Sequence, residues 1–150
     1  MQTLHRSILA CSAALTLVAS GTAVAGEYGT AEEARAMLDK VVAAMQTDPA
    51  KALAMFTSGE GGFRDRDLYP YCVGPDGKFS AHPTLVGTDA IGLIDKAGNP
   101  IGQQIMVVAK NAEVSEVEYV WNRPGETTPT GKVAYAIKIG DQICAVGYYK

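Results

Sequence analysis

A turn between two short strand-like segments, within residues 68–83, limits the fold of this chain more than any other feature. In the turn Gly74–Gly77, proline presets the backbone angle, while aspartate and glycine accept the left-handed corner. The two segments therefore predict a β-hairpin. Because side chains alternate along a strand, Tyr69 and Tyr71 are expected on one face of it. Pro70 lies between them without an amide hydrogen, which predicts an edge position or a local distortion there.

Periodic apolar positions and capping residues predict the remaining elements. A capping box at Thr30 and Glu33 starts an amphipathic helix of about 16 residues. Asp48 caps a second helix, and Asn99 with Pro100 caps a third. The predicted helices and strands have the approximate bounds 31–46, 49–58, 68–73, 78–81, 101–109, 117–121, 133–139 and 143–149. This order indicates an α+β domain with an antiparallel sheet.

The first 25 residues are predicted to be a secretory signal peptide. A weakly basic start precedes the apolar stretch Ile8–Ala19, and Ala23–Ala25 has the small-x-small pattern of a cleavage site. The apolar stretch is too short for a membrane span. Acylation at Cys11 is the weaker alternative, because the apolar run continues well past that residue. We therefore expect a single domain at residues 26–150, periplasmic or secreted, with no membrane insertion after cleavage.

Charge and motif content argue against several classes of function. The chain has a formal net charge of −3 and no cluster of basic residues, so nucleic acid is not an expected partner. No phosphate-binding glycine loop, nucleophile elbow or Cys-x-x-Cys pair is present. Asp76 and Asp95 are explained by turns without a metal ion. The sequence thus predicts no cofactor, no metal site and no catalytic residues.

Six side chains are candidates for a ligand site: Tyr69, Tyr71, His82, Trp121, Lys132 and Tyr135. Tyrosine and tryptophan combine an apolar body with one polar tip, as small-molecule pockets require, although ordinary sheet packing is the alternative for them. His82 could donate a hydrogen bond to a carboxylate or, as a cation, pair with it; otherwise it is a structural histidine. Lys132 could hold an anion, unless it is simply solvated.

Two cysteines, Cys72 and Cys144, lie in predicted strands beyond the signal peptide. In an oxidising compartment they would form a disulfide if their strands are neighbours. The alternative is that both are small buried hydrophobic residues. The sequence pattern alone leaves the two interpretations open.

Taken together, several segments resemble the single Cache domain. They are Phe63–Tyr69, Pro75–Lys78, Ala81–Pro83, Leu85–Gly87, Asp95–Gly98, Val117–Pro124 and Val146–Tyr149. The similarity extends from about residue 32 to residue 150. It implies a PAS-like fold, in which a long N-terminal helix packs across a five-stranded antiparallel sheet of order 2-1-5-4-3. That order makes the first and last strands neighbours and so favours the disulfide between Cys72 and Cys144.

The resemblance also implies a function. Cache domains are extracytoplasmic sensor modules, and the single type commonly binds small organic anions such as acetate, propionate, lactate or pyruvate. On this chain the six candidate residues would line the pocket. The chain departs from the family at Pro70, where members usually carry a bulky apolar residue. It also has no second membrane segment or signalling domain, so we expect a free binding protein or a partner of a membrane chemoreceptor or histidine kinase.

Two alternatives to a ligand-binding sensor remain at this point. One is an exported protein-interaction module that partners a membrane receptor or kinase and has no small-molecule ligand. The other is a small exported enzyme on a cone-shaped α+β fold. An enzyme of that kind needs a carboxylate or histidine with a shifted pKa inside its cavity, and only His82 would serve.

Overall fold

The computed structural model describes residues 26–150, and the predicted signal peptide, residues 1–25, lies outside them. The elements are α1 (Ala31–Thr47), α2 (Pro49–Ser58), the 3-10 turn η1 (Glu60–Gly62), β1 (Pro70–Val73), β2 (Phe79–Ala81), α3 (Ile101–Val108), β3 (Ser115–Asn122), β4 (Pro129–Ile139) and β5 (Gln142–Tyr149). The strands form one antiparallel sheet of order β2-β1-β5-β4-β3. The predicted fold class and strand order are confirmed.

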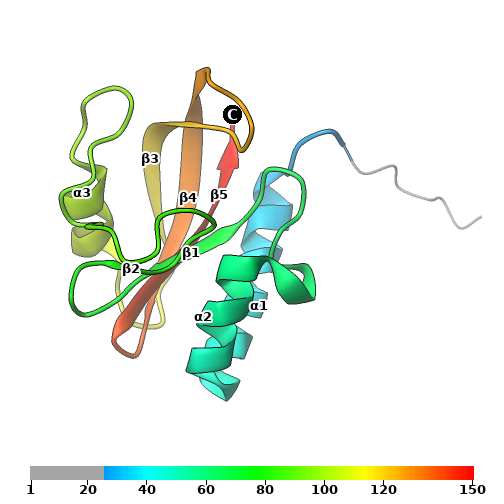
Figure 1. Cartoon of the computed structure of the whole chain (residues 1–150), viewed down its shortest axis with the longest axis vertical. Helices are drawn as coiled ribbons and strands as arrows, with labels where there is room; N and C mark the ends of the chain where they lie inside the picture. Colours follow the sequence, from blue (N-terminus) through cyan, green and yellow to red (C-terminus); the bar gives the residue numbers. More distant parts are fainter. Residues whose placement is uncertain (1–25) are drawn as a thin grey trace, which may run out of the picture.

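The two N-terminal helices cover one face of the sheet, and α3 lies on the opposite face (Figure 1). The predicted capping box is present, because the Thr30 hydroxyl accepts from the Glu33 amide and the Glu33 carboxylate accepts from the Thr30 amide. Asp48 caps α2 by accepting from the Lys51 amide. No helix within residues 26–150 combines the length and the apolar character needed to cross a bilayer.

The third helix begins differently from the prediction. Pro100 occupies its N-cap position, and no side chain caps the helix. Asn99, the predicted cap, instead donates from its side-chain amide to the Asp95 carboxylate at 3.0 Å. Asn99 therefore stabilises a local turn with its side chain and does not cap α3.

The hairpin forms as predicted, and its pairing explains how Pro70 is tolerated. β1 lies between β2 and β5, but β2 pairs only with Cys72 and Val73. The Cα atoms of Cys72 and Cys144 are 4.0 Å apart, which is the close, non-hydrogen-bonded kind of antiparallel pair. Two residues earlier, the nitrogen of Pro70 therefore also faces away from β5, on the side where β2 has ended. Pro70 occupies a local edge within an inner strand.

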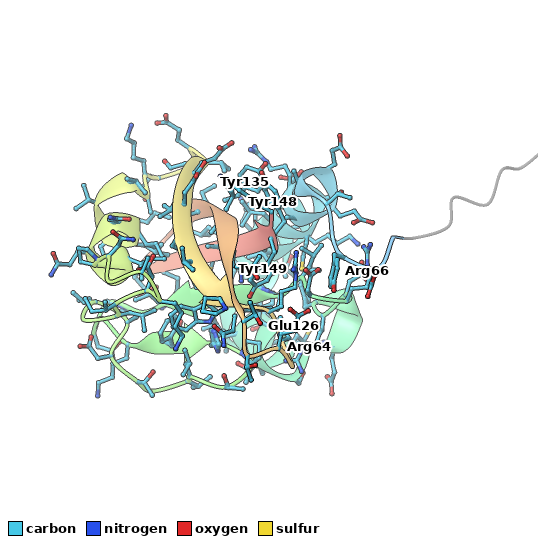
Figure 2. All side chains as sticks on the ribbon, turned by 90° about the horizontal axis from the view of Figure 1, so that it is seen from above. Arg64, Arg66, Glu126, Tyr135, Tyr148 and Tyr149 are labelled. Atoms are coloured by element: carbon cyan, nitrogen blue, oxygen red, sulfur yellow. A yellow bond between two sulfur atoms is a disulfide. The ribbon has the colours of Figure 1, made fainter. Side chains whose placement is uncertain are left out.

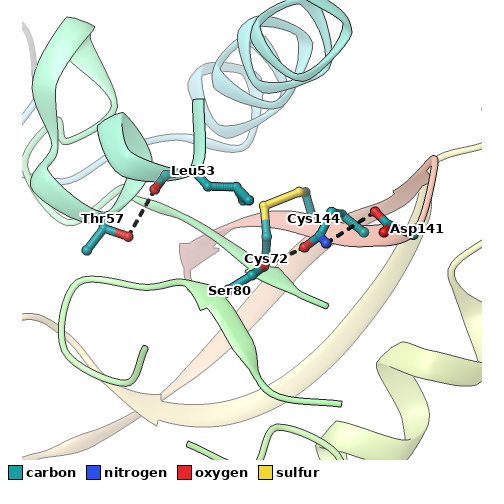
Figure 3. Close-up of a disulfide and its surroundings, with 7 residues drawn as sticks. Leu53, Thr57, Cys72, Ser80, Asp141 and Cys144 are labelled. Atoms are coloured by element: carbon teal, nitrogen blue, oxygen red, sulfur yellow. Dashed lines mark hydrogen bonds between the residues drawn. A yellow bond between two sulfur atoms is a disulfide. The ribbon is translucent and has the colours of Figure 1, made fainter. Parts of the chain in front are cut away.

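The disulfide between Cys72 and Cys144 is confirmed. The two residues lie directly opposite each other on β1 and β5, and both are fully buried. Their side chains point to the helix-covered face, where Leu53 of α2 packs nearby (Figure 3). The bond therefore ties β1, which carries Tyr71 on its other face and directly follows Tyr69, to the centre of the sheet.

Candidate ligand-binding site

A cavity of about 30 Å³ lies on the face of the sheet opposite α1 and α2. Residues 84–108, called the cover here, close it from outside. The sheet side of the cavity is lined by Tyr69, Tyr71, Val73, Phe79, His82, Tyr119 and Trp121, and the cover contributes Leu85, Ala90, Leu93, Ile101, Gly102, Ile105 and Met106. The walls are thus mostly apolar, with hydroxyl and imidazole groups on the sheet side.

Small residues make room for this cavity. Ala134, Ala136 and Ala145 are fully buried on this face, and Gly147 pairs with Ala134 across β4 and β5. Large side chains near the sheet edges therefore extend over the small residues of the central strands. The cover packs tightly against itself, because a Cβ atom at Gly102 would overlap the Ala90 carbonyl oxygen.

Four of the six predicted site residues meet at this cavity. Tyr69, Tyr71, His82 and Trp121 all line it, although they come from three separate parts of the chain. The ring centres of Tyr69 and His82 are 5.5 Å apart, and those of Tyr71 and His82 are 6.3 Å apart. The structure thus brings these four candidate residues to one cavity, and their role in ligand binding stays a prediction.

His82 is held as a neutral hydrogen-bond donor. Its Nδ1 atom accepts from the backbone amides of Thr84 and Leu85, at 3.0 and 3.1 Å. A ring nitrogen that accepts carries no proton, so the proton of the neutral ring is on Nε2. Burial, followed by the charges of Lys132 and Arg64, lowers the pKa of His82 to about 4. Of the two predicted ligand contacts, only the neutral donor is therefore available near neutral pH.

Lys132 is buried, contrary to the alternative that it is solvated. Only 1% of the residue is exposed. Its Nζ atom lies 4.1 Å from the ring centre of Tyr69 and 6.0 Å from that of Tyr119, so it sits directly behind two residues that line the cavity. A Cβ atom at Gly147 would overlap its side chain, so glycine there leaves the space that it fills.

The charge of Lys132 is not balanced by an ion pair. The ammonium group donates to the Tyr149 hydroxyl at 3.4 Å and lies 4.6 Å from that ring centre. Within residues 26–150, no carboxylate forms a salt bridge with it. Burial lowers the pKa of Lys132, while Tyr69 and Asp67 oppose that effect. Lys132 is thus a buried cation stabilised mainly by aromatic faces.

Tyr135 is not at the cavity, contrary to the prediction. Side chains alternate along β4, so Tyr135 points to the face opposite Lys132 and Ala134. There its ring lies beside that of Tyr148 (Figure 2), with 6.0 Å between the ring centres. The Arg35 guanidinium lies 5.9 Å from the centre of the Tyr135 ring. Tyr135 belongs to the helix-covered core, and the ordinary sheet-packing alternative holds for it.

Sequence reasoning missed two tyrosines of this site. The hydroxyl of Tyr119 shares a 3.4 Å hydrogen bond with that of Tyr71, and burial raises the pKa of both groups. The alternation that selected Trp121 also places Tyr119 on its face, so this residue was within reach of the sequence pattern. Tyr149 pairs with Lys132 across the sheet, which required the β4–β5 register.

Asp95 fastens the cover to the edge of the sheet. Its carboxylate accepts from the amides of Ala97, Asn99 and Val120, at 2.9, 2.7 and 3.0 Å, and from the Asn99 side chain. Burial raises its pKa, but these hydrogen bonds outweigh that effect and lower the pKa to about 2. The carboxylate needs no metal ion, and no group of three potential ligands gathers for one anywhere in residues 26–150.

The chain matches the family model described as Single Cache domain 2 over residues 15–147. Three solved structures share the fold. A methyl-accepting chemotaxis protein from Vibrio parahaemolyticus superposes with a TM-score of 0.64 at 17% identity, covering 79% of this chain and 86% of that one. A Cache chemosensory domain, described as showing carboxylic acid recognition, gives 0.58 at 22% identity, with coverages of 79% and 86%.

The third is a periplasmic sensor domain of a chemotaxis protein, with a TM-score of 0.59, 21% identity and coverages of 79% and 88%. No curated protein matches the sequence. The family match spans most of the chain, and the order of strands in the sheet agrees with it. The chain belongs to the Single Cache domain 2 family.

Proposed function

We propose that this chain is a periplasmic sensor or binding domain for a small carboxylate, which it binds without chemical change. The observation that carries the proposal is Lys132, a fully buried cation without an acidic partner in the described chain, directly behind the wall of a covered cavity. A buried charge is costly unless it is paired. A carboxylate arriving through the cavity would supply the missing negative charge.

The other polar groups of the cavity suit the same ligand. The Nε2–H group of His82 and one hydroxyl of the hydrogen-bonded Tyr71–Tyr119 pair are neutral donors, and a carboxylate is an acceptor only. The apolar cover would contact a short alkyl group. One of the solved structures with this fold is described as showing carboxylic acid recognition, which supports the same class.

The size of the cavity argues for a short acid. The cavity volume of about 30 Å³ is roughly a tenth of the 300 Å³ or more that pockets for drug-sized ligands occupy. Even acetate would require Tyr69 or the cover to move. We therefore expect acids of two to four carbons to bind best, and longer ones to bind weakly.

Binding rather than turnover fits the titration of these groups. A general base works best with a pKa near the working pH. The pKa of His82 is about 4, and both hydrogen-bonded tyrosines have raised pKa values. None of these three groups is poised to take a proton at pH 7. In our proposal a membrane chemoreceptor or histidine kinase reads the bound state.

Calorimetry with C2 to C5 carboxylates at pH 7.5 tests the proposal. We expect saturable binding of at least one short acid, weakened about tenfold or more by Lys132→Met, because a charged hydrogen bond contributes about 1.5–3 kcal/mol. Lys138→Met is the matched control, since Lys138 lies on the same strand but outside the cavity lining. The absence of binding by every acid, or unchanged binding by Lys132→Met, would contradict the proposal.

An interaction module without a small ligand is the second candidate. The cover exposes Val86, Ile91, Ile94 and Val107, which are between 41% and 80% accessible. Exposed apolar side chains can mark a protein-binding surface. If no acid binds, this surface becomes the site to investigate, with Val107→Ser as the first variant in a binding assay against the isolated receptor or kinase.

A further inference from the structure

The segment that leads into α1 is held against the rear of the candidate site. Residues 26–30, called the leading segment here, are anchored where the Gly29 amide donates to the Asp67 carboxylate at 2.7 Å. Asp67 is buried and comes two residues before Tyr69. A Cβ atom at Gly29 would overlap the Leu68 side chain, so the backbone approaches as closely as glycine allows.

Arg123 connects this anchor to the sheet. Its Nε atom donates to the second oxygen of Asp67 at 3.2 Å, and both side chains are largely buried. Its guanidinium carbon lies 4.1 Å from the ring centre of Tyr28 and 5.2 Å from that of Tyr149. Arg123 therefore contacts the leading segment on one side and Tyr149 on the other.

Tyr149 completes the connection to the candidate site. Its hydroxyl accepts from Lys132 at 3.4 Å and donates to the Asn122 carbonyl at 2.6 Å. Asp67, Arg123, Lys132 and Tyr149, called the charge cluster here, therefore hold two cations but one carboxylate. Burial is the main influence on both groups, lowering the pKa of Lys132 and raising that of Tyr149, and the Asp67 charge adds a smaller upward contribution to each pKa.

We propose that the positive charge of Lys132 helps to hold the leading segment in place through the charge cluster, and that neutralising this charge loosens the segment. The two oxygens of Asp67 accept from the Gly29 amide and from Arg123, and the cations of the cluster attract its negative charge. A ligand carboxylate beside Lys132, which rests on the proposed function, would compensate the cation and repel Asp67. Removal of the Lys132 charge by substitution would have the first of these effects without any ligand.

The coupling has to be reciprocal. If a bound carboxylate weakens the contact between Asp67 and Gly29, then release of the leading segment must strengthen carboxylate binding by the same factor, and loss of the Asp67 charge should act in the same direction. The leading segment and the ligand thus compete for one source of positive charge. The binding site would in this way report its occupancy to the residues that precede α1.

Amide hydrogen exchange at Gly29, followed by NMR in the purified chain, tests the first part without a ligand. We expect Lys132→Met to speed exchange at Gly29 about fivefold. The melting temperature should rise in the same variant, because loss of an unpaired buried charge favours the folded state. Faster local exchange in a more stable protein separates release of the segment from general destabilisation. Lys138→Met should change neither quantity.

Two further variants test the connection and the reciprocity. Tyr149→Phe keeps the ring but removes the hydroxyl, and we expect it to speed Gly29 exchange, whereas Tyr148→Phe on the opposite face should not. Asp67→Asn should bind the short acid about fivefold more tightly than the unaltered chain. Unchanged Gly29 exchange in both Lys132→Met and Tyr149→Phe would overturn the inference, as would equal or weaker binding by Asp67→Asn. If the unaltered chain binds no acid, the proposed function fails, and the exchange measurements still decide the coupling.

Discussion

At the scale of single residues, His82 should make stability depend on pH. The pKa of a histidine in an unfolded chain is about 6.5, and in the folded protein that of His82 is about 4. Between these values the unfolded chain binds a proton that the folded one does not. The free energy of unfolding should therefore be highest above pH 6.5 and fall as the pH drops toward 4.

From pH 7 to pH 5 we expect a loss of about 2 kcal/mol from this group. Urea unfolding at the two values measures it. His82→Gln is the matched variant, because its side-chain oxygen can still accept from a backbone amide while the group no longer titrates. His82 is the only histidine in the described residues, so a pH dependence of equal size in the variant would show that other groups cause it.

Substitution of Lys132 should raise the free energy of unfolding. An unpaired buried cation is retained at a cost, and replacement of buried charges by apolar residues is often neutral or stabilising. We expect Lys132→Met to raise the free energy of unfolding by about 1–3 kcal/mol in the absence of a carboxylate. Lys138→Met should change it by no more than about 0.5 kcal/mol. Thermal unfolding distinguishes the two, and a clear loss of stability in Lys132→Met would mean that the aromatic rings alone satisfy the cation.

At the scale of elements, the cover depends on one carboxylate at its base. In Asp95→Asn, the new amide hydrogens would face the donors of Asn99 and Val120. We expect a loss of about 2 kcal/mol, together with faster limited proteolysis within residues 84–94. Asp89→Asn on the same loop is the control, because a single oxygen of Asp89 accepts from Ile91 and Gly92, and asparagine keeps it. Equal proteolysis of both variants would show that the cover is held by packing instead.

The same scale shows why some elements could be predicted and others could not. A capping box and a Pro-Asp-Gly turn are satisfied by neighbours in sequence, so the first helix and the hairpin follow from local chemistry. The start of α3 could not be predicted in this way, because Asn99 could either cap the helix or bind Asp95. The carboxylate of Asp95 also accepts from the amide of Val120, which is distant in sequence. A prediction from neighbouring residues cannot include the hydrogen bond from Val120, because Val120 belongs to a strand elsewhere in the sequence.

At the scale of the whole molecule, the two faces of the sheet decide which candidate residues form the site. Alternation correctly grouped Tyr69 with Tyr71, but it could not say which face of β4 meets the helices, and so Tyr135 was assigned to the wrong one. Burial of Lys132 depends on the space at Gly147, one strand away. Four aromatic and imidazole residues of the pocket could thus be predicted from residue types, whereas its apolar cover and its charge balance required the assembled fold.

The cover over the cavity also limits the rate at which a ligand can bind. A cavity of about 30 Å³ is too small for an organic ligand, so its cover has to move outward before a ligand can enter. The rate of capture then levels off at the rate of opening, however much ligand surrounds the protein. Changes in ligand concentration that last less than the opening time would not alter the fraction of protein that has bound ligand. On the proposed function, such a domain would average the ligand concentration around it over an interval set by the opening of the cover rather than by diffusion.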